Sequence, residues 1–456
     1  MIVDKTVDRR LLRGFLLVLL IGGEILFGSL VAMMLEHTYL ILGAAIGLVV
    51  VVATFIEPVF GLYIFVTTIF TEALLLLGSV SAARLVGFLV LGAWIARSLS
   101  NRHFKIIVPT QGWFAAMFII WGLMSAMWAM DTRKLFTALL LLLQSMALYI
   151  LVINLVNSTQ RAQIILAIIV IVSLFLALLT IMRVLTGDLV EGRADLGQIS
   201  VGDMNAQAAY FLPGATLLMI LFSHNTHLVQ KLFLLFGLSV VVLAILATSS
   251  RGAIVSLGII LILGTIIDCR MWQVALPMLL VGGIAMSFLP HTFVDRIVSI
   301  AAFSDRGAGR LDVWSVALQI IQAHPISGVG LDNFGRAFDR YLAETPGILS
   351  EVGRGMGSHN IFLNVQSELG VIGSVLFVVF IGMTVRNGLV AIMNLKRAGA
   401  SHLTALATTA WLSLIGMLVM GLFIDLQYWK LFWLLMALPE VMRILSVESV
   451  RETALS

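Results

Sequence analysis

The residues of this chain that are best suited to chemistry are one histidine and several arginines. His359 stands in Gly357-Ser358-His359-Asn360, where a polar stretch of about residues 290–358 ends and an apolar stretch begins. A neutral imidazole can accept a proton from a hydroxyl group near neutral pH. Arginine makes paired hydrogen bonds to phosphate and stays charged at any working pH. The pattern predicts a site that holds an anionic group beside a proton-accepting side chain.

Arg251 has the clearest signal among the arginines. It lies in Ser249-Ser250-Arg251-Gly252-Ala253, between two apolar stretches with almost no loop between them. A cation at a membrane boundary is costly to desolvate unless it has a partner, so such a residue is a functional candidate. The alternative is that Arg251 only extends its charge to the lipid headgroups.

The other candidates also have structural alternatives. Arg193 can pair with its acidic neighbours, and Arg310 opens a predicted amphipathic helix, where a salt bridge would be structural. Asn205, with Asp203, either binds a substrate or caps the next helix. Glu368, inside an apolar stretch, is a functional candidate or a structural partner of an arginine. His359 itself could simply be an interfacial residue.

Composition places these residues in a membrane protein. The chain is 60% hydrophobic and 11% charged, with a mean hydropathy of +1.08, whereas soluble domains carry about 25% charged residues. Many apolar stretches reach the roughly 18 residues that cross a bilayer, and they lack the alternation of a barrel strand. The first run, about Leu11–Leu35, is too long for a signal peptide and is expected to remain as an anchor. A single cysteine, Cys269, excludes an intramolecular disulfide framework and cysteine-based metal clusters.

The apolar stretches predict an all-α, polytopic transmembrane helix bundle with 12–14 spans in a single domain, residues 1–456. The predicted spans are residues 12–34, 39–56, 59–77, 81–98, 111–129, 135–155, 162–182, 205–223, 230–248, 251–267, 272–289, 360–383, 403–422 and 430–447. The pair that meets at Glu57-Pro58 could be one broken unit, because proline stops or kinks a helix.

The basic residues predict the orientation of the bundle. With the N-terminus in the cytoplasm, most lysines and arginines of the short loops face inward, as the positive-inside rule requires. The C-terminus then also lies in the cytoplasm. Nine further basic residues fall on the outer face, and all of them are arginine: Arg183, Arg193, Arg251, Arg296, Arg306, Arg310, Arg336, Arg340 and Arg354. Because they oppose the general trend, they need another reason to be there.

The polar stretch 290–358 is predicted to be an outer loop with its own short helices. Apolar residues recur at helical spacing over residues 311–321, which predicts an amphipathic helix that ends before Pro325. Gly328-Val329-Gly330 predicts a tight turn, and a second short helix is expected over about residues 333–344. Ser358 is placed to cap the helix that follows the loop.

Five motifs occur in the order typical of one protein family. They are Trp128-Ala129-Met130-Asp131, Arg193 with Asp203-Met204-Asn205, Ser250-Arg251-Gly252-Ala253, Gly309-Arg310 with Trp314 and Pro325-Ile326-Ser327-Gly328-Val329-Gly330, and Ser358-His359-Asn360 with Glu368, Gly370 and Gly373. Together they resemble the O-antigen ligase and polymerase superfamily of bacterial inner-membrane enzymes. The resemblance covers about residues 110–445. Its members resemble the C-type glycosyltransferases, which are membrane-embedded.

The resemblance implies a lipopolysaccharide or polysaccharide biosynthesis enzyme that works at the periplasmic face. It would move a glycan from undecaprenyl pyrophosphate to an acceptor hydroxyl with inversion, without a metal or other cofactor. The acceptor is lipid A-core for a ligase and a second lipid-linked glycan for a polymerase. His359 would be the general base and Arg193 and Arg251 would hold the pyrophosphate. Further substrate contacts would come from Arg310, Arg354, Asn205 and Asn360, with Glu368 in support.

Two other classes of function remain open at this stage. A transporter or flippase for an anionic substrate would favour broken helices near the middle of the membrane and internal repeats, and no repeat is visible. An interaction scaffold for envelope assembly would not need His359. The partners expected on any of these readings are membrane lipids and lipid-linked or anionic substrates, and no nucleic acid.

Overall fold

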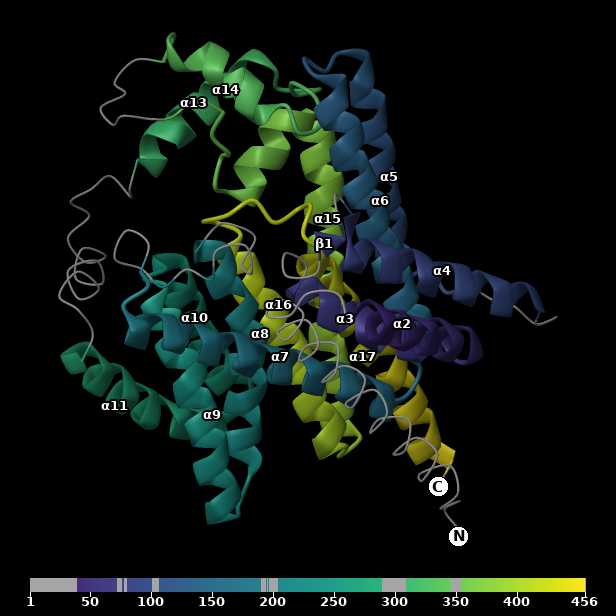
Figure 1. Ribbon diagram of the computed structural model, residues 1–456, viewed down its shortest axis with the longest axis vertical. Coiled ribbons are helices and arrows are strands. Elements are labelled where there is room, and N and C mark those ends of the chain that lie inside the picture. The colour runs from purple at the N-terminus through teal and green to yellow at the C-terminus, as the bar shows by residue number, and fades with distance from the viewer. Residues whose placement is uncertain are drawn as a thin grey trace.

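The chain folds into an all-α polytopic helix bundle with one small strand pair (Figure 1). The structure is a computed structural model. It describes residues 39–71, 76–77, 80–100, 106–189, 194, 196, 204–288, 309–345, 353 and 355–455. Eight of the described helices are long and apolar enough to cross a membrane, judged by length and composition, and four shorter apolar helices accompany them. The predicted fold class is therefore confirmed.

The elements follow one another along the chain in this order. The first half contains α2 (Tyr39–Ile56), α3 (Pro58–Phe70), β1 (Leu76–Leu77), β2 (Val80–Ser81), α4 (Ala82–Ser100), α5 (Thr110–Met124), η1 (Ser125–Met127), α6 (Thr132–Leu155), α7 (Thr159–Thr186) and α8 (Met204–His224). The second half contains α9 (Leu228–Ala247), α10 (Arg251–Ile267), η3 (Cys269–Met271), α11 (Trp272–Phe288), α13 (Arg310–Ala323), α14 (Phe334–Leu342), α15 (Ile361–Arg397), α16 (Ser401–Met420) and α17 (Lys430–Leu455).

Most helix boundaries agree with the apolar stretches, and the exceptions have physical reasons. The predicted span 59–77 is interrupted, because α3 ends at Phe70 and residues 76–77 pair with residues 80–81 as an antiparallel hairpin. The span predicted over residues 360–383 continues as a helix to Arg397. Polar residues lower the hydropathy there without ending the helix, because Asn387 is accommodated by hydrogen bonds to Gln111 and Glu440. The predicted span 12–34 lies outside the described residues.

Local capping chemistry sets several helix ends. Pro58 begins α3 directly after α2, which confirms the break at Glu57-Pro58. Asp131 accepts hydrogen bonds from the backbone nitrogens of Arg133 and Lys134 and so caps α6. Gly187 ends α7 with a φ of 73°, a conformation that glycine adopts without steric cost.

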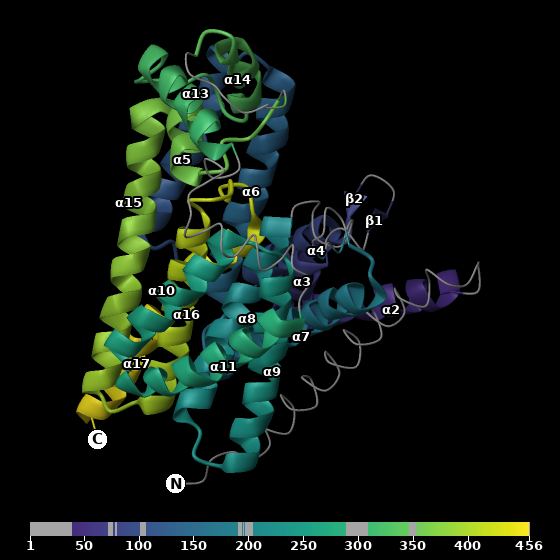
Figure 2. The same cartoon turned by 90° about the vertical axis from the view of Figure 1, so that its left-hand side faces the viewer.

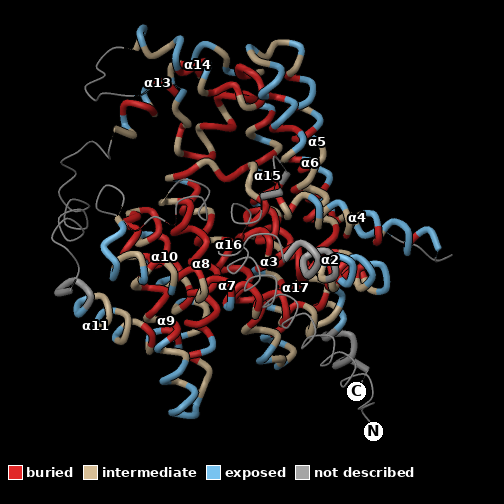
Figure 3. Tube along the Cα trace, in the orientation of Figure 1, coloured by how far each residue is buried: buried red, intermediate tan, exposed pale blue. Residues whose placement is uncertain are grey.

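The core of the bundle lies around α8 and α17. Figure 3 shows the buried residues concentrated along the central helices, with the exposed residues on the peripheral ones. Within α17, Glu440 is fully buried and accepts hydrogen bonds from Gln111 of α5 (2.8 Å), Asn387 of α15 (3.0 Å) and Arg443. A buried carboxylate with this many donors is satisfied, so the network joins three helices instead of destabilising them.

Residues 309–345, the described part of the predicted outer loop, form a small helical layer at one end of the bundle. Its helices α13 and α14 lie there in both views (Figures 1 and 2), and they pack through a separate apolar cluster that includes Val316, Phe334 and Phe338. The predicted amphipathic helix and the short helix after it are thereby confirmed as α13 and α14.

Gly370 divides α15 into two arms, residues 361–369 and 371–397. Its φ of 62° and ψ of −163° are essentially restricted to glycine. The loop after α13 fits against this break: the Val371 nitrogen donates to Pro325 O (2.9 Å), and the Gly330 nitrogen donates to Glu368 O (2.8 Å). A side chain at Gly328 or Gly370 would collide with the facing backbone. These glycines therefore dock the outer loop onto the start of α15.

Candidate functional site

One buried carboxylate holds the segment that carries His359. Asp425, in the loop between α16 and α17, accepts a hydrogen bond from Ser358 Oγ (2.8 Å). It also accepts hydrogen bonds from the backbone nitrogens of His359 (3.2 Å) and Asn360 (3.0 Å). A Cβ at Gly357 would lie 2.6 Å from Asp425 Oδ2, so only glycine allows this close approach. Three consecutive residues are thus fixed by one side chain.

His359 adopts a strained backbone conformation. Its φ is 50°, in the left-handed region that non-glycine residues rarely occupy. Such a conformation costs about 1–3 kcal/mol and persists only where the surroundings enforce it. Among the described residues, the other non-glycine residues with positive φ are Ser249 (52°) and Asp332 (55°). Ser249 lies two residues before Arg251, so strain occurs beside two of the candidate residues.

The imidazole of His359 is half-buried, and neither ring nitrogen has a hydrogen-bond partner among the residues that the structure describes. The carboxylate next to it bonds the backbone instead of the ring. Burial raises the pKa of Asp425 above its usual value, and the hydrogen bond from Ser358 opposes this shift. The ring is therefore held in place through its main chain and has both nitrogens available.

The cap of α15 differs from the prediction. Asn360, not Ser358, caps the helix, because Asn360 Oδ1 accepts from the backbone nitrogens of Phe362 (3.0 Å) and Leu363 (3.2 Å). Ser358 lies two residues before the capping position, and its hydroxyl donates a hydrogen bond to Asp425. The prediction was wrong because the long-range carboxylate competes for the serine. Asn360 was predicted to contact the substrate. Its side-chain oxygen Oδ1 instead accepts hydrogen bonds within the protein.

Arg251, Asn205 and Arg310 come together near the same loop. Arg251 is the first residue of α10, and Ser250 Oγ beside it donates to Asn205 Oδ1 in the first turn of α8 (3.0 Å). Gly252 would meet the Phe423 ring at 2.7 Å if it had a Cβ, and the Arg310 guanidinium lies 5.4 Å from the centre of that ring. Phe423 precedes Asp425 by two residues, so one loop contacts both the arginine region and the histidine segment.

The loop between α16 and α17 also contacts the first residue of α15. The Ile361 nitrogen donates to Gly421 O (2.8 Å). Figure 1 shows this loop as a yellow trace between the outer helical layer and the helices below it. The start of α15, the start of α10 and this loop therefore face one region of the molecule.

Glu368 lies deeper in the short arm of α15. Tyr428 donates to Glu368 Oε2 (2.8 Å), and the Phe334 nitrogen lies 3.4 Å from Oε1. Asn364, with its amide turned to donate, lies 3.2 Å from both carboxylate oxygens. These partners link the loop between α16 and α17, the layer of α13 and α14, and the start of α15. Among the described residues no arginine contacts Glu368. Its structural partners are Tyr428, Asn364 and the backbone of Phe334 instead of the arginine that the sequence suggested.

The Trp-Ala-x-Asp and Gly-Arg…Trp motifs have structural contacts around this region. Asp131 pairs with Arg336 (2.7 Å), and its backbone nitrogen donates to Asn333 Oδ1 (2.6 Å). Trp314 Nε1 donates to Ser358 O (3.1 Å) and so supports the residue before His359. The motifs thus bring the outer layer against α6 and against the histidine segment.

Three residues named by the sequence cannot be placed. Arg193, Arg354 and Asp203 lie outside the described residues. Their predicted roles remain predictions from the sequence.

Sequence reasoning missed Asp425 and Asp332. Asp425 interrupts two apolar stretches, residues 403–422 and 430–447, and that polar break was the available signal. Asp332 lies in the turn before α14, where burial raises its pKa to about 6. The negative charges of Asp131 and Asp425 add to this shift, and the charge of Lys134 opposes it. Both acids lie close enough to influence each other electrostatically.

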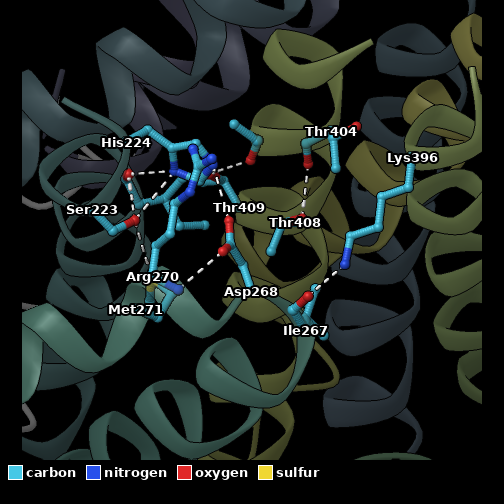
Figure 4. A network of polar contacts seen from close by, with 12 residues as sticks. Ser223, His224, Ile267, Asp268, Arg270, Met271, Lys396, Thr404, Thr408 and Thr409 are labelled. Carbon is cyan, nitrogen blue, oxygen red and sulfur yellow. Dashed lines mark hydrogen bonds and ion pairs between the residues drawn. The ribbon is translucent and has the colours of Figure 1, made fainter. Parts of the chain in front are cut away.

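A second histidine and carboxylate pair lies at the far end of α8. His224 Nε2 is 3.0 Å from Asp268 Oδ2, and its Nδ1 is 3.0 Å from Ile220 O and 3.2 Å from Ser223 Oγ. Figure 4 shows this network, in which Asp268 also accepts from the Arg270 nitrogen (3.0 Å). Both ring nitrogens of His224 are engaged, in contrast to those of His359.

The comparisons with known proteins agree with the motifs. Residues 232–378, about a third of the chain, match the family model described as O-Antigen ligase. This segment runs from α9 into the long arm of α15 and contains Arg251, Arg310, His359 and Glu368. A comparison with curated proteins found no match. The family match supports the resemblance: residues 232–378 of this chain, whose apolar helices are typical of a multi-pass membrane protein, are similar to the O-antigen ligase family.

Proposed function

We propose that the chain transfers a glycan from undecaprenyl pyrophosphate to an acceptor hydroxyl at the periplasmic face of the bacterial inner membrane. The proposed reaction is of the O-antigen ligase type, with lipid A-core as acceptor. The family match supports ligase or polymerase activity in general. The observation that carries the proposal is the His359 imidazole, held by its backbone on Asp425 in a strained conformation and without a partner among the described residues.

In this proposal His359 acts as the general base. It accepts the proton of the acceptor hydroxyl while that oxygen forms a bond to the anomeric carbon of the donor sugar. The bond between the anomeric carbon and the pyrophosphate oxygen breaks, and its electron pair leaves with undecaprenyl pyrophosphate. Because attack occurs opposite the leaving group, the anomeric configuration is inverted. His359 then releases the proton to solvent.

The arginines stabilise the charge that develops on the pyrophosphate. Arg251 is the principal described candidate, since it begins α10, where the helix N-terminus also favours an anion. Arg193 shares this role by the motif, and Arg310 and Arg354 make further phosphate or sugar contacts. In the proposed reaction the guanidinium groups neutralise the charge of the pyrophosphate, so the transfer does not depend on a metal.

A polymerase would use the same chemistry with a second lipid-linked glycan as acceptor. The two functions are separated by the glycans of a deletion strain. Loss of a ligase leaves lipid A-core without polymer while carrier-linked polymer persists. Loss of a polymerase leaves lipid A-core that carries single repeat units. The first result is expected, and the second would replace the ligase proposal with the polymerase.

A purified assay tests the reaction itself. The full-length protein in lipid nanodiscs is given undecaprenyl-pyrophosphate-linked glycan and lipid A-core, and the product is isolated. We expect a glycan on lipid A-core with the anomeric configuration opposite to that of the donor. Absence of transfer by a folded protein, with both substrates present, would contradict the proposal.

The proposed orientation can be tested with the single cysteine. Cys269 is exposed and, by the positive-inside reading, faces the cytoplasm together with both termini. A membrane-impermeant maleimide should not label it in intact spheroplasts but should label it after lysis. The matched control is Cys269→Ser combined with Glu344→Cys, which moves the thiol to the outer layer and should be labelled in intact spheroplasts. The reverse pattern would place the His359 region in the cytoplasm.

A further inference from the structure

A cavity lies between α3, α4 and α6. Figure 1 shows α4 and α6 on the side of the bundle away from α10. Its volume is about 230 Å³, which is below the roughly 300–1,000 Å³ of pockets that enclose whole small molecules. It therefore has room for part of a long molecule. The walls are largely apolar and include Phe88, Leu140 and Leu143, which are 57%, 46% and 51% exposed.

Two polar side chains line this apolar cavity. Arg84 comes from the first turn of α4, and Gln144 comes from the middle of α6. The Nε of Arg84 and both polar atoms of the Gln144 amide are shielded from solvent, and no residue that the structure describes forms a hydrogen bond with them. No salt bridge is found for Arg84 in the described part of the chain, whereas Arg97 of the same helix pairs with Glu57. A guanidinium and an amide in an apolar wall are costly to leave unsatisfied.

We propose that this cavity binds an anionic phospholipid, with part of one acyl chain between α4 and α6 and the phosphate on Arg84. The acyl chain matches the apolar walls and the limited volume. The phosphate matches the guanidinium, which makes paired hydrogen bonds to it. A modest rotation of the Gln144 side chain into the cavity lets its amide donate to a lipid ester oxygen. The lipid thereby satisfies polar groups that have no hydrogen-bond partner within the described part of the chain.

The site is separate from the proposed transfer site and does not depend on it. Arg84 lies on α4 and Arg251 on α10, and Figures 1 and 2 place these helices on different sides of the bundle. A single guanidinium suits one phosphate group, whereas the pyrophosphate of a glycan carrier needs more positive charge than Arg84 alone provides. We therefore assign a bilayer phospholipid to this cavity.

Native mass spectrometry of the full-length protein tests the assignment. The protein is delipidated in detergent and titrated with dioleoyl phosphatidylglycerol or, separately, with dioleoyl phosphatidylcholine. We expect one tightly retained phosphatidylglycerol, bound about tenfold more tightly than phosphatidylcholine, because the choline ammonium of phosphatidylcholine offsets the charge of its own phosphate. Arg84→Gln should remove this preference, and Arg84→Lys should keep part of it. Ala147→Phe, which fills the cavity, should weaken the binding of both lipids.

The matched control is Arg133→Gln, which makes the same charge change at an exposed position on α6 outside the cavity. It should bind phosphatidylglycerol as the unaltered protein does. The proposal would be overturned if Arg84→Gln bound phosphatidylglycerol as tightly as the unaltered protein does. It would also be overturned if Arg133→Gln lost as much phosphatidylglycerol binding as Arg84→Gln.

A second variant keeps the test decisive if Arg84→Gln does not fold. Gln144→Leu removes the unsatisfied amide, so it should raise the melting temperature of the lipid-free protein. The same variant should weaken the binding of phosphatidylglycerol severalfold. A purely structural role of Gln144 would change the melting temperature without changing lipid affinity, and that result would contradict the assignment.

Discussion

Two histidines of this protein lie near a buried or half-buried carboxylate, and the carboxylates engage them in different ways. Asp268 lies 3.0 Å from the ring of His224, whose other nitrogen contacts Ile220 O and Ser223 Oγ. Asp425 bonds the backbone nitrogen of His359 and leaves the ring without a partner among the described residues. The first arrangement immobilises an imidazole and occupies it. The second immobilises the residue and keeps its imidazole free to exchange a proton.

This difference shows why residue type alone does not identify a base. Both histidines lie at helix ends, and both have serine neighbours. What distinguishes them is the backbone: His359 has a φ of 50°, and Asp425 uses its hydrogen bonds to hold that conformation. Strain of this kind needs compensation elsewhere and is concentrated at functional sites. We therefore propose that the chemistry occurs at the His359 end and that the His224 end has a structural role.

Apart from the histidine variants, the largest loss of transfer activity is expected at Arg251. Arg251→Lys should lower the rate of transfer about 100-fold or more, as removal of one preorganised donor does in other enzymes. An ammonium keeps the charge but cannot make the paired contact. The rate is measured with purified protein, and Arg270→Lys, at the His224 end, should keep the normal rate. Full activity of Arg251→Lys would indicate that Arg251 only reaches toward the lipid headgroups.

A smaller effect is expected at Asp425. Asp425→Asn keeps one accepting oxygen but places an amide group against backbone donors, so the His359 segment should shift. We expect the rate of transfer to fall about 10- to 100-fold, because a displacement of about 1 Å at a reacting group has an effect of this size. Asp268→Asn is the matched change at the other end and should leave the rate unchanged. If the two variants transfer equally well, the contrast between the ends is wrong.

The smallest effect concerns stability and pH at Asp332. Burial raises the pKa of Asp332 from 3.8 to about 6, so the folded protein holds this proton more tightly than the unfolded chain does. Stability should therefore fall as pH rises from about 4 to about 6 and remain lower above that. Asp332→Asn removes this loss and tolerates the positive φ. Its melting temperature should exceed that of the unaltered protein at pH 7.5 and equal it below pH 4. If the difference in melting temperature between the two proteins were the same at both pH values, the proposed effect of Asp332 would be wrong.

Much of the fold follows from the sequence, because apolar length and local capping act over short distances. The boundaries of α2, α7, α10 and α13 lie close to the predicted ones. What could not be predicted depends on distant contacts. The direction change at Gly370 requires the Pro325–Gly330 loop to dock there, and nothing local to α15 encodes that loop's position.

The candidate site shows the same limit. His359 and Arg251 were identified by residue type and motif, and the structure places them on segments that contact one loop. Asp425 was missed because its importance comes from a partner that lies far away in the sequence. The assignment of the helix cap to Ser358 failed for the same reason, since Asp425 takes the serine hydroxyl and leaves the cap to Asn360.

The most direct test compares His359→Ala with His224→Ala in the purified transfer assay, with folding checked by melting temperature. We expect His359→Ala to lower the rate of transfer by at least about 100-fold, the contribution typical of a general base, and to melt at the normal temperature. His224→Ala should melt at a lower temperature, because Asp268 and the buried Ser223 each lose a polar partner. It should still transfer glycan. Full transfer by a folded His359→Ala protein would contradict the central claim.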